Sequence, residues 1–178
     1  METQSQKHTL TITIRITVTA LFMALNIAMS SFGIPVPGGH LYLCDAVIVL
    51  ASILLKPWEA FVVGGLGSFL GDFLFYPEPM YVSLVTHGLQ AAVISFFSHY
   101  TLKKHPRIAS GIGAVIGAAI MVTGYTLGKI YVYSTFEYAM LKLPFEIVQG
   151  LVGVVLGFGL CWHFGIHKAF TALINREA

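Results

Sequence analysis

Long apolar stretches separated by short polar connections run through the whole 178-residue chain. A membrane-spanning helix needs about 20 consecutive, mainly apolar residues. Six stretches approach this length, at about residues 10–32, 41–55, 58–75, 81–102, 108–133 and 143–164. The second is short, and Pro57 with Trp58 predicts a tight turn into the third. Residues 1–178 are therefore predicted to form one all-α domain, a membrane bundle of six transmembrane helices.

The composition agrees with this pattern. Hydrophobic residues make up 56% of the chain and charged residues 10%, whereas soluble domains carry about 25% charged residues. The lipid bilayer is therefore the expected environment. The net charge is +2, and no basic cluster of the kind that binds phosphate backbones is present, so a nucleic acid partner is not expected. The first stretch resembles a signal peptide, but the apolar segments downstream favour an uncleaved helix.

The distribution of basic residues predicts the orientation, because Lys and Arg in short loops are retained in the cytoplasm. With a cytoplasmic N-terminus, eight of the ten basic residues fall on the cytoplasmic side: Lys7, Arg15, Lys56, Lys103, Lys104, Arg107, Lys168 and Arg176. Lys129 and Lys142 fall on the outer side. We therefore expect a multi-pass protein of the cell membrane with both termini in the cytoplasm.

Several polar residues fall in the outer half of the predicted helices. Ionisable groups in a membrane are costly, and they usually line a cavity or pair with one another. Spacings of three or four residues place three pairs each on one helix face: His87 with Gln90, Tyr125 with Lys129, and Glu146 with Gln149. One cavity lined by these pairs would suit a small polar or heteroaromatic ligand, covered by aromatic residues such as Phe75, Tyr76 and Tyr133. The alternative is that each polar side chain extends to the interface.

Small residues repeat at intervals of four in several helices. Ala20, Ala24 and Ala28 form a stripe on the first helix, which allows another helix to approach closely. Spacing alone leaves open whether that helix belongs to this chain or to a partner. The glycine pairs are expected to pack within the bundle: Gly67 with Gly71, Gly113 with Gly117, Gly124 with Gly128, and Gly153 with Gly157.

Signals for catalysis and metal binding are weak. The stretch "GYTLGKI" lacks the spacing and the Ser or Thr of a phosphate-binding loop. His163 and His167 have the spacing of helical zinc ligands, but no third ligand is evident in the sequence. Cys44 and Cys161 are predicted near opposite membrane faces and are interpreted as free thiols. The chain is therefore expected to be no enzyme and to bind no metal or cofactor.

The quoted segments together resemble a known family. "ALFMALNIA", "IPVPGGHLYLCDAVIVLASILLKPWEAFVVGGLGSFLGD", "HGLQAAVISF", "AAIMVTGYTLGK" and "LPFEIVQGLVGVVLG" are similar to the S component, the substrate-binding subunit, of energy-coupling factor (ECF) vitamin transporters. This resemblance implies capture of a vitamin or precursor from outside, under a lid formed partly by the first outer loop. It implies as partners a transmembrane T component and two cytoplasmic ATPases, which use ATP and Mg²⁺.

The resemblance also assigns roles to residues. The stripe of Ala20, Ala24 and Ala28 would dock on the T component, and transport would proceed by toppling of the S component in the membrane. Combined with the polar pattern, it yields nine candidate ligand-binding residues: His40, Asp45, Asp72, His87, Gln90, Tyr125, Lys129, Glu146 and Gln149.

The chain looks nearest to the branch associated with hydroxymethylpyrimidine and vitamin B6 compounds such as pyridoxine. It departs from that branch at Glu146, where asparagine is usual, and at Lys129, where an acid is usual. The two residues are expected either to form a salt bridge or to change the polarity of the ligand, which keeps pantothenate or another vitamin as an alternative. A solitary ion-coupled transporter using Asp72, His87 and Glu146, a membrane enzyme and a structural subunit also remain open.

Overall fold

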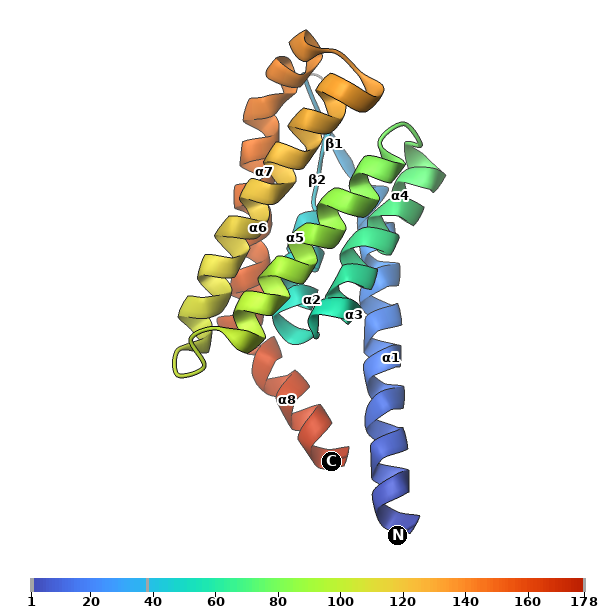
Figure 1. Cartoon of the computed structure of the whole chain (residues 1–178), viewed down its shortest axis with the longest axis vertical. Coiled ribbons are helices and arrows are strands. Elements are labelled where there is room, and N and C mark those ends of the chain that lie inside the picture. Colours follow the sequence, from blue (N-terminus) through green and yellow to red (C-terminus); the bar gives the residue numbers. More distant parts are fainter. Residues whose placement is uncertain (1, 38, 178) are drawn as a thin grey trace.

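The computed structural model describes residues 2–37 and 39–177, with side chains for residues 12–37 and 39–174. Figure 1 shows an elongated bundle in which a β-hairpin lies near one end. Helix α1 begins, and α8 ends, at the opposite end. The elements in order are α1 (Glu2–Ser30), β1 (Gly33–Val36), β2 (Gly39–Tyr42), α2 (Cys44–Leu54), α3 (Pro57–Phe61), η1 (Val62–Leu66), α4 (Gly67–Phe75), α5 (Met80–Tyr100), α6 (Pro106–Gly128), η2 (Lys129–Tyr133), α7 (Phe136–Trp162) and α8 (Ile166–Glu177).

The all-α membrane bundle is confirmed. Within the described residues, five segments are long and apolar enough to cross a membrane: Ile12–Ser30, Pro57–Phe75, Met80–Tyr100, Pro106–Tyr133 and Phe136–Trp162. Two of these segments contain a π-helical turn, η1 or η2, in an otherwise α-helical course. The predicted span over residues 41–55 is wrong in length. It is the 11-residue helix α2, which covers about 17 Å of a hydrocarbon core of about 30 Å.

Three further boundaries differ from the prediction. Helix α1 begins at Glu2 rather than near residue 10, because polar residues at its start continue the helix beyond the apolar stretch. Helix α7 begins at Phe136 rather than residue 143. Thr135 caps it by accepting the backbone N–H of Tyr138 at 3.3 Å. Helix α8 was not expected, because its polar and apolar residues alternate as on an interfacial helix rather than a spanning one.

The loop that follows α1, predicted from the sequence to be the first outer loop, forms a β-hairpin. Strands β1 and β2 pair antiparallel, with Pro35 opposite His40 and Gly33 opposite Tyr42. Gly39 has a φ of +123°, a conformation that side chains with a Cβ rarely adopt. This glycine therefore permits the tight reversal that brings β2 back toward the bundle.

Close helix contacts explain the glycine pairs. A Cβ on Gly71 would lie 2.7 Å from Ser30 Oγ, and one on Gly117 would lie 2.5 Å from Ile94. The pairs in α4, α6 and α7 likewise face α1, α5 and α2. Cβ atoms do not approach other heavy atoms this closely, so only glycine lets these helices meet. The prediction that the glycine pairs pack within the bundle is confirmed.

Helix α2 forms the centre of the bundle. All of its 11 residues are buried. It packs against α7, α5 and α1, and Val49, Leu50, Ile53 and Leu54 share a core cluster with Ile94 of α5 and Cys161 of α7. Large side chains such as Val115 and Val155 are instead 62% and 69% exposed on the outside of the bundle. This arrangement of apolar residues on the outside suits a protein surrounded by lipid.

Helix α8 closes the end of the bundle where the chain begins and ends. Ile166 and Phe170 pack against the core cluster that contains Val49. The His167 ring stacks on Trp162 with 4.4 Å between centroids. The pKa of His167 is lowered by burial and, to a smaller extent, by neighbouring His99 and Arg107. Arg15 of α1 pairs with Glu59 of α3 at the same end through both carboxylate oxygens.

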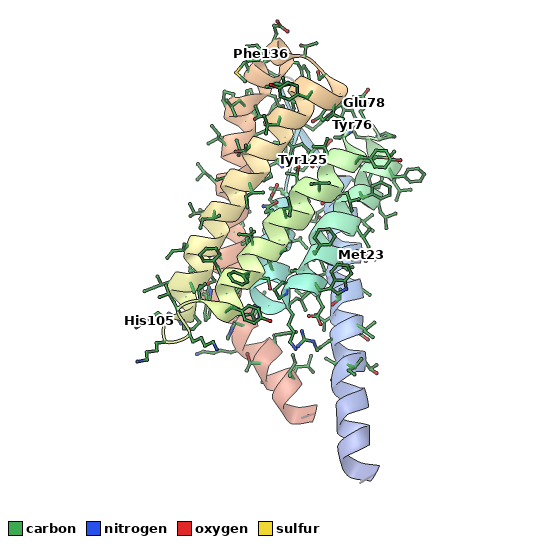
Figure 2. The ribbon with its side chains drawn as sticks, viewed as in Figure 1. Met23, Tyr76, Glu78, His105, Tyr125 and Phe136 are labelled. Carbon is green, nitrogen blue, oxygen red and sulfur yellow. The ribbon has the colours of Figure 1, made fainter. Side chains whose placement is uncertain are left out.

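The basic residues follow the predicted asymmetry. Six of them lie in segments at the α8 end: Arg15, Lys56, Lys103, Lys104, Arg107 and Lys168. The side chains of Lys7 and Arg176 fall outside the described residues. Figure 2 shows His105 at the α8 end, with Glu78 and Phe136 near the hairpin end. Lys129 and Lys142, predicted on the outer side, are buried in the hairpin half.

Candidate ligand-binding cavity

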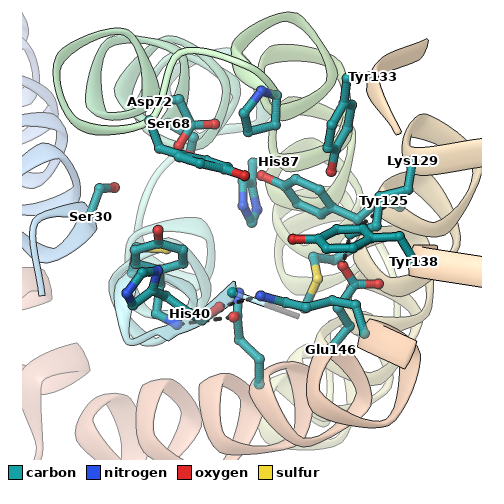
Figure 3. Close-up of a pocket in the computed structure, with 18 residues that line it drawn as sticks. Ser30, His40, Ser68, Asp72, His87, Tyr125, Lys129, Tyr133, Tyr138 and Glu146 are labelled. Carbon is teal, nitrogen blue, oxygen red and sulfur yellow. Dashed lines mark hydrogen bonds and ion pairs between the residues drawn. The ribbon is translucent and has the colours of Figure 1, made fainter. Parts of the chain in front are cut away.

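A cavity of about 290 Å³ lies between the hairpin and the helices beneath it. Figure 3 shows side chains from several elements around one space, with Ser30, Asp72, His87, Tyr133 and Glu146 among them. Four tyrosines supply much of its aromatic surface: Tyr76, Tyr125, Tyr133 and Tyr138. Polar groups between aromatic walls are typical of small-molecule sites, which orient a ring by a few hydrogen bonds.

Seven of the nine predicted binding residues line this cavity: His40, Asp72, His87, Tyr125, Lys129, Glu146 and Gln149. The structure thus brings together residues from β2, α4, α5, α6, η2 and α7. Asp45 and Gln90 lie outside the lining and are each 1% exposed. Tyr76 and Tyr133 line the cavity as expected, whereas Phe75 is 52% exposed on the surface.

Asp45 is the centre of a hydrogen-bond network below the cavity. Its Oδ1 accepts from Gln90 Nε2 at 2.9 Å, and its Oδ2 accepts from Gln149 Nε2 at 2.7 Å. Gln90 Oε1 lies 2.6 Å from His87 Nδ1, and Gln149 Oε1 accepts the backbone N–H of Tyr42 at 3.0 Å. A buried carboxylate must be fully hydrogen-bonded to be tolerated. The network meets this requirement and joins α2, α5, α7 and the hairpin.

Lys129 and Glu146 form a buried ion pair between η2 and α7. Each residue is 4% exposed. Lys129 Nζ also lies 5.2 Å from the centroid of the Tyr125 ring and 5.8 Å from that of Tyr133, and Thr126 Oγ1 is 3.5 Å from Glu146 Oε2. Of the two expected roles for these residues, the structure thus shows the salt bridge.

A second hydrogen-bond chain joins α4, α5 and α6. Ser83 Oγ donates to Asp72 Oδ2, and it lies 2.5 Å from the Tyr125 hydroxyl. The Tyr125 ring meets the His87 ring edge-on, with 5.2 Å between centroids. Asp72, His87 and Tyr125 are therefore held as one unit on the same wall of the cavity.

The hairpin is fastened to α7 by two contacts. Lys142 Nζ donates to the backbone carbonyl of His40 at 2.6 Å, and Gln149 accepts from the backbone of Tyr42. The hairpin is thus positioned over the cavity, as a lid would be.

Three side chains of metal-binding type meet at the cavity floor. One ligand atom from each of Cys44, Asp45 and His87 lies within 4.8 Å of the others. However, both oxygens of Asp45 already accept hydrogen bonds from glutamine amides. The carboxylate is therefore satisfied without an ion.

The comparison with known proteins identifies the family. The sequence matches the family described as "ECF-type riboflavin transporter, S component" over residues 11–164. The chain belongs to this family. It is also similar to a Pyrococcus woesei protein described as "Uncharacterized protein in gap 3'region", with 32% identity over 139 residues, which are 77% of this chain and 91% of that protein.

The S component is therefore a multi-pass membrane protein and the vitamin-capturing subunit of an ECF-type transporter. Members of this family are specificity subunits rather than enzymes, and they associate with a T component and ATPases. The match extends over all five described spans, but it does not select the hydroxymethylpyrimidine and vitamin B6 branch.

The alanine stripe of the S component points away from its own bundle. Ala20, Ala24 and Ala28 are all exposed, whereas Asn26 and Ser30 of the same helix are buried against α4 and η1. Packing of the stripe within this chain, one of the two roles that spacing left open, is therefore not what the structure shows.

Several polar groups of the S component were not predicted from the sequence, including Ser30 and Tyr138, which line the cavity. The sequence predicted that Lys142 lies on the outer side but in no helix, because the last predicted span begins at residue 143. Its spacing of four from Glu146 would have placed it on the same helix face. Ser83 and Ser68 gave no signal, since serine is common in membrane helices and only the fold brings Ser83 to Asp72.

Proposed function

We propose that this S component binds a vitamin built on a single heteroaromatic ring, either a vitamin B6 compound such as pyridoxine or hydroxymethylpyrimidine. The observation that carries this proposal is the cavity itself. Its volume of about 290 Å³ is at the lower end of the range for small-molecule sites. Tyrosine rings on several sides suit stacking with one aromatic ring. The polar groups between them suit hydroxymethyl and ring-nitrogen substituents.

Riboflavin is the second candidate, because the description of the matching family names it. Its three fused rings and sugar-alcohol chain make it much larger than pyridoxine, so the hairpin would have to move outward to admit it. Pantothenate, a third possibility, needs a cation for its carboxylate. Lys129 is engaged by Glu146, which leaves Lys142 as the group in the lining that would bind it.

The proposed membrane topology has six crossings and two cytoplasmic termini, within a single domain of residues 1–178. In this proposal α2 and the hairpin together form the second crossing. The location of six basic residues in segments at the α8 end supports a cytoplasmic position for that end. The cavity then lies toward the outside, where a ligand from the medium enters beneath the hairpin.

The proposed partners are a T component and two ATPases, which use ATP and Mg²⁺, while this chain binds no cofactor or metal. The exposed stripe of Ala20, Ala24 and Ala28 supports docking on the T component, because small side chains permit close helix contact in lipid. Toppling of the docked S component would then carry the ligand to the cytoplasmic side.

Calorimetric titration of the purified protein tests the substrate class. Pyridoxine, pyridoxal, hydroxymethylpyrimidine, pantothenate, riboflavin and thiamine are titrated separately. We expect saturable binding of a single-ring compound, and its loss in Tyr125→Ala, which removes a cavity wall. Ile108→Ala, on the exposed outside of α6, is the matched control and should bind normally.

Three results would contradict parts of this proposal. Binding of none of the six compounds would exclude the proposed substrate class, and binding of riboflavin alone would establish the second candidate. Uptake by cells without any ECF ATPase would favour a solitary ion-coupled transporter using Asp72, His87 and Glu146.

A further inference from the structure

We propose that the cavity selects its ligand by hydrogen-bond polarity, a proposal that rests on the function proposed above. One wall presents hydrogen-bond acceptors at Asp72, His87 and Tyr125, and the opposite side presents the ammonium of Lys142. The ligand class that fits is a ring with N–H or O–H donors on one edge and a negatively charged or strongly accepting oxygen on the other. A hydroxypyridine in its zwitterionic form has both.

The donors and acceptors in the Asp45 network can be assigned from groups that can act only as a donor or only as an acceptor. The backbone N–H of Tyr42 can only donate, so Gln149 directs Oε1 toward the hairpin and Nε2 toward Asp45. Gln90 likewise directs its Nε2 toward Asp45, donating to Oδ1 at 2.9 Å. The remaining atom of Gln90, Oε1, can only accept, and the atom 2.6 Å from it is His87 Nδ1.

His87 must therefore carry a proton on Nδ1. In the neutral ring the other nitrogen, Nε2, is then a hydrogen-bond acceptor. His87 lines the cavity, whereas Gln90, toward which Nδ1 is directed, does not. We therefore infer that Nε2 is the ring nitrogen that faces the cavity. Asp45 thus determines, through Gln90, that His87 presents a hydrogen-bond acceptor to a ligand.

The hydrogen-bond chain through Ser83 also leaves an acceptor facing the cavity. The hydroxyl of Ser83 has one hydrogen, which it donates to Asp72. The contact of 2.5 Å between Ser83 Oγ and the Tyr125 hydroxyl therefore requires Tyr125 to donate. The Tyr125 oxygen then has only lone pairs left for the cavity. Two separate chains thus each end in an acceptor on the same wall, beside the carboxylate of Asp72.

The opposite side carries unused donors. Among the residues that the structure describes, Lys142 Nζ donates one hydrogen bond, to the His40 carbonyl, although an ammonium has three N–H groups. Among the side chains that the structure describes, no carboxylate lies within 4.0 Å of Lys142. Lys129 differs, because Glu146 neutralises it. Helix α7 packs on α2 and α6, whereas α4, which carries Asp72, packs on α1 and α5. Lys142 and Asp72 therefore face the cavity from different sides.

The tautomer of His87 provides a test that needs no ligand. The ligand-free protein is labelled with ¹⁵N-histidine, and the His87 signals are assigned by their absence in His87→Asn. Near neutral pH we expect a protonated nitrogen at Nδ1 and an unprotonated one at Nε2. In Asp45→Asn the new amide can donate to Gln90, so the proton should move to Nε2. Ser83→Ala removes no hydrogen bond of the Asp45 network and should leave the tautomer unchanged.

A proton on Nε2 in the wild-type protein, or a doubly protonated ring, would overturn the proposal. So would an unchanged tautomer in Asp45→Asn, since Asp45 would then not control His87. Failure of the protein to bind any vitamin would reject the proposed function but would leave this NMR result intact. The two proposals can therefore fail separately.

Binding measurements test the donor side. Pyridoxine is compared with its 3-O-methyl ether, which cannot form the negatively charged oxygen. We expect the ether to bind at least about tenfold more weakly, because it loses a charge-assisted hydrogen bond. In Lys142→Met this preference should disappear. Equal binding of the two compounds by the wild-type protein, or an unchanged preference in Lys142→Met, would overturn the assignment of Lys142.

Discussion

Substitution of Glu146 by glutamine removes one charge of the buried ion pair while keeping the shape of the side chain. Lys129 would then be an ammonium that is 4% exposed and lacks its carboxylate. Removing one partner of a buried pair costs about 3–5 kcal/mol. Both residues also line the cavity, where water can solvate the ammonium. We therefore expect a loss in stability near the lower limit, about 3 kcal/mol.

The assay is thermal unfolding of the detergent-solubilised protein in a cycle of four proteins: wild type, Glu146→Gln, Lys129→Met and the double variant. For a chain of this size, 1 kcal/mol corresponds to a change in melting temperature of about 2–4 °C. Each single variant should therefore melt roughly 6–12 °C below wild type. The double variant should be more stable than either, because it contains no unpaired charge.

Additive losses in the double variant would refute this reasoning, since they would mean that the two charges do not stabilise each other. Little or no loss in both single variants would refute it as well. That result would show that the pair is solvated rather than buried in the folded protein.

Three other predictions concern packing, pH and assembly. Gly153→Ala should destabilise the protein by about 1–3 kcal/mol, because its Cβ would lie 2.5 Å from that of Asp45. Gly159→Ala is the control and should be neutral or slightly stabilising in thermal unfolding, because its Cβ would meet no atom within 4 Å beyond the adjacent backbone of its own helix. The pKa of His167 is lowered in the folded state, so as pH falls the unfolded chain takes up a proton first, and stability should decrease below about pH 6.5. In His167→Phe the melting temperature should depend less on pH in this range, and an unchanged dependence would contradict the assignment. Ala24→Leu should prevent co-purification with the T component and ATPases while ligand affinity is unchanged, whereas normal assembly would exclude docking through the stripe.

The sequence predicts the spans well, because lipid requires long apolar helices whose hydrogen bonds are internal. Five of the six predicted spans correspond to structural segments, and their bounds agree within a few residues except for the early starts of α1 and α7. Helix α2 was misjudged because its apolar run continues through Leu41 in the hairpin. Helix α8 lacks the apolar length on which the prediction depended.

The candidate site was predicted through the cost of burying polar groups in a membrane. That argument finds residues such as Asp72 and Glu146, but it does not say which of them face a cavity. Their spacing of three residues predicted that Gln90 and His87 both face the cavity. In the structure Gln90 lies outside the lining and forms a hydrogen bond with His87. Whether a polar residue contacts the ligand or orients another side chain depends on tertiary contacts, which a single sequence does not contain.

The shortness of α2 explains the existence of the cavity. Its 11 residues extend about 17 Å, roughly half of the hydrocarbon thickness. The hairpin and the cavity beneath it lie where further turns of α2 would otherwise continue, next to Cys44 at the start of the helix. Each added turn would extend α2 by about 5.4 Å. Insertions or deletions between Tyr42 and Cys44 would therefore change the depth of the cavity and the size of ligand it accepts, without any change in the lining of the other helices.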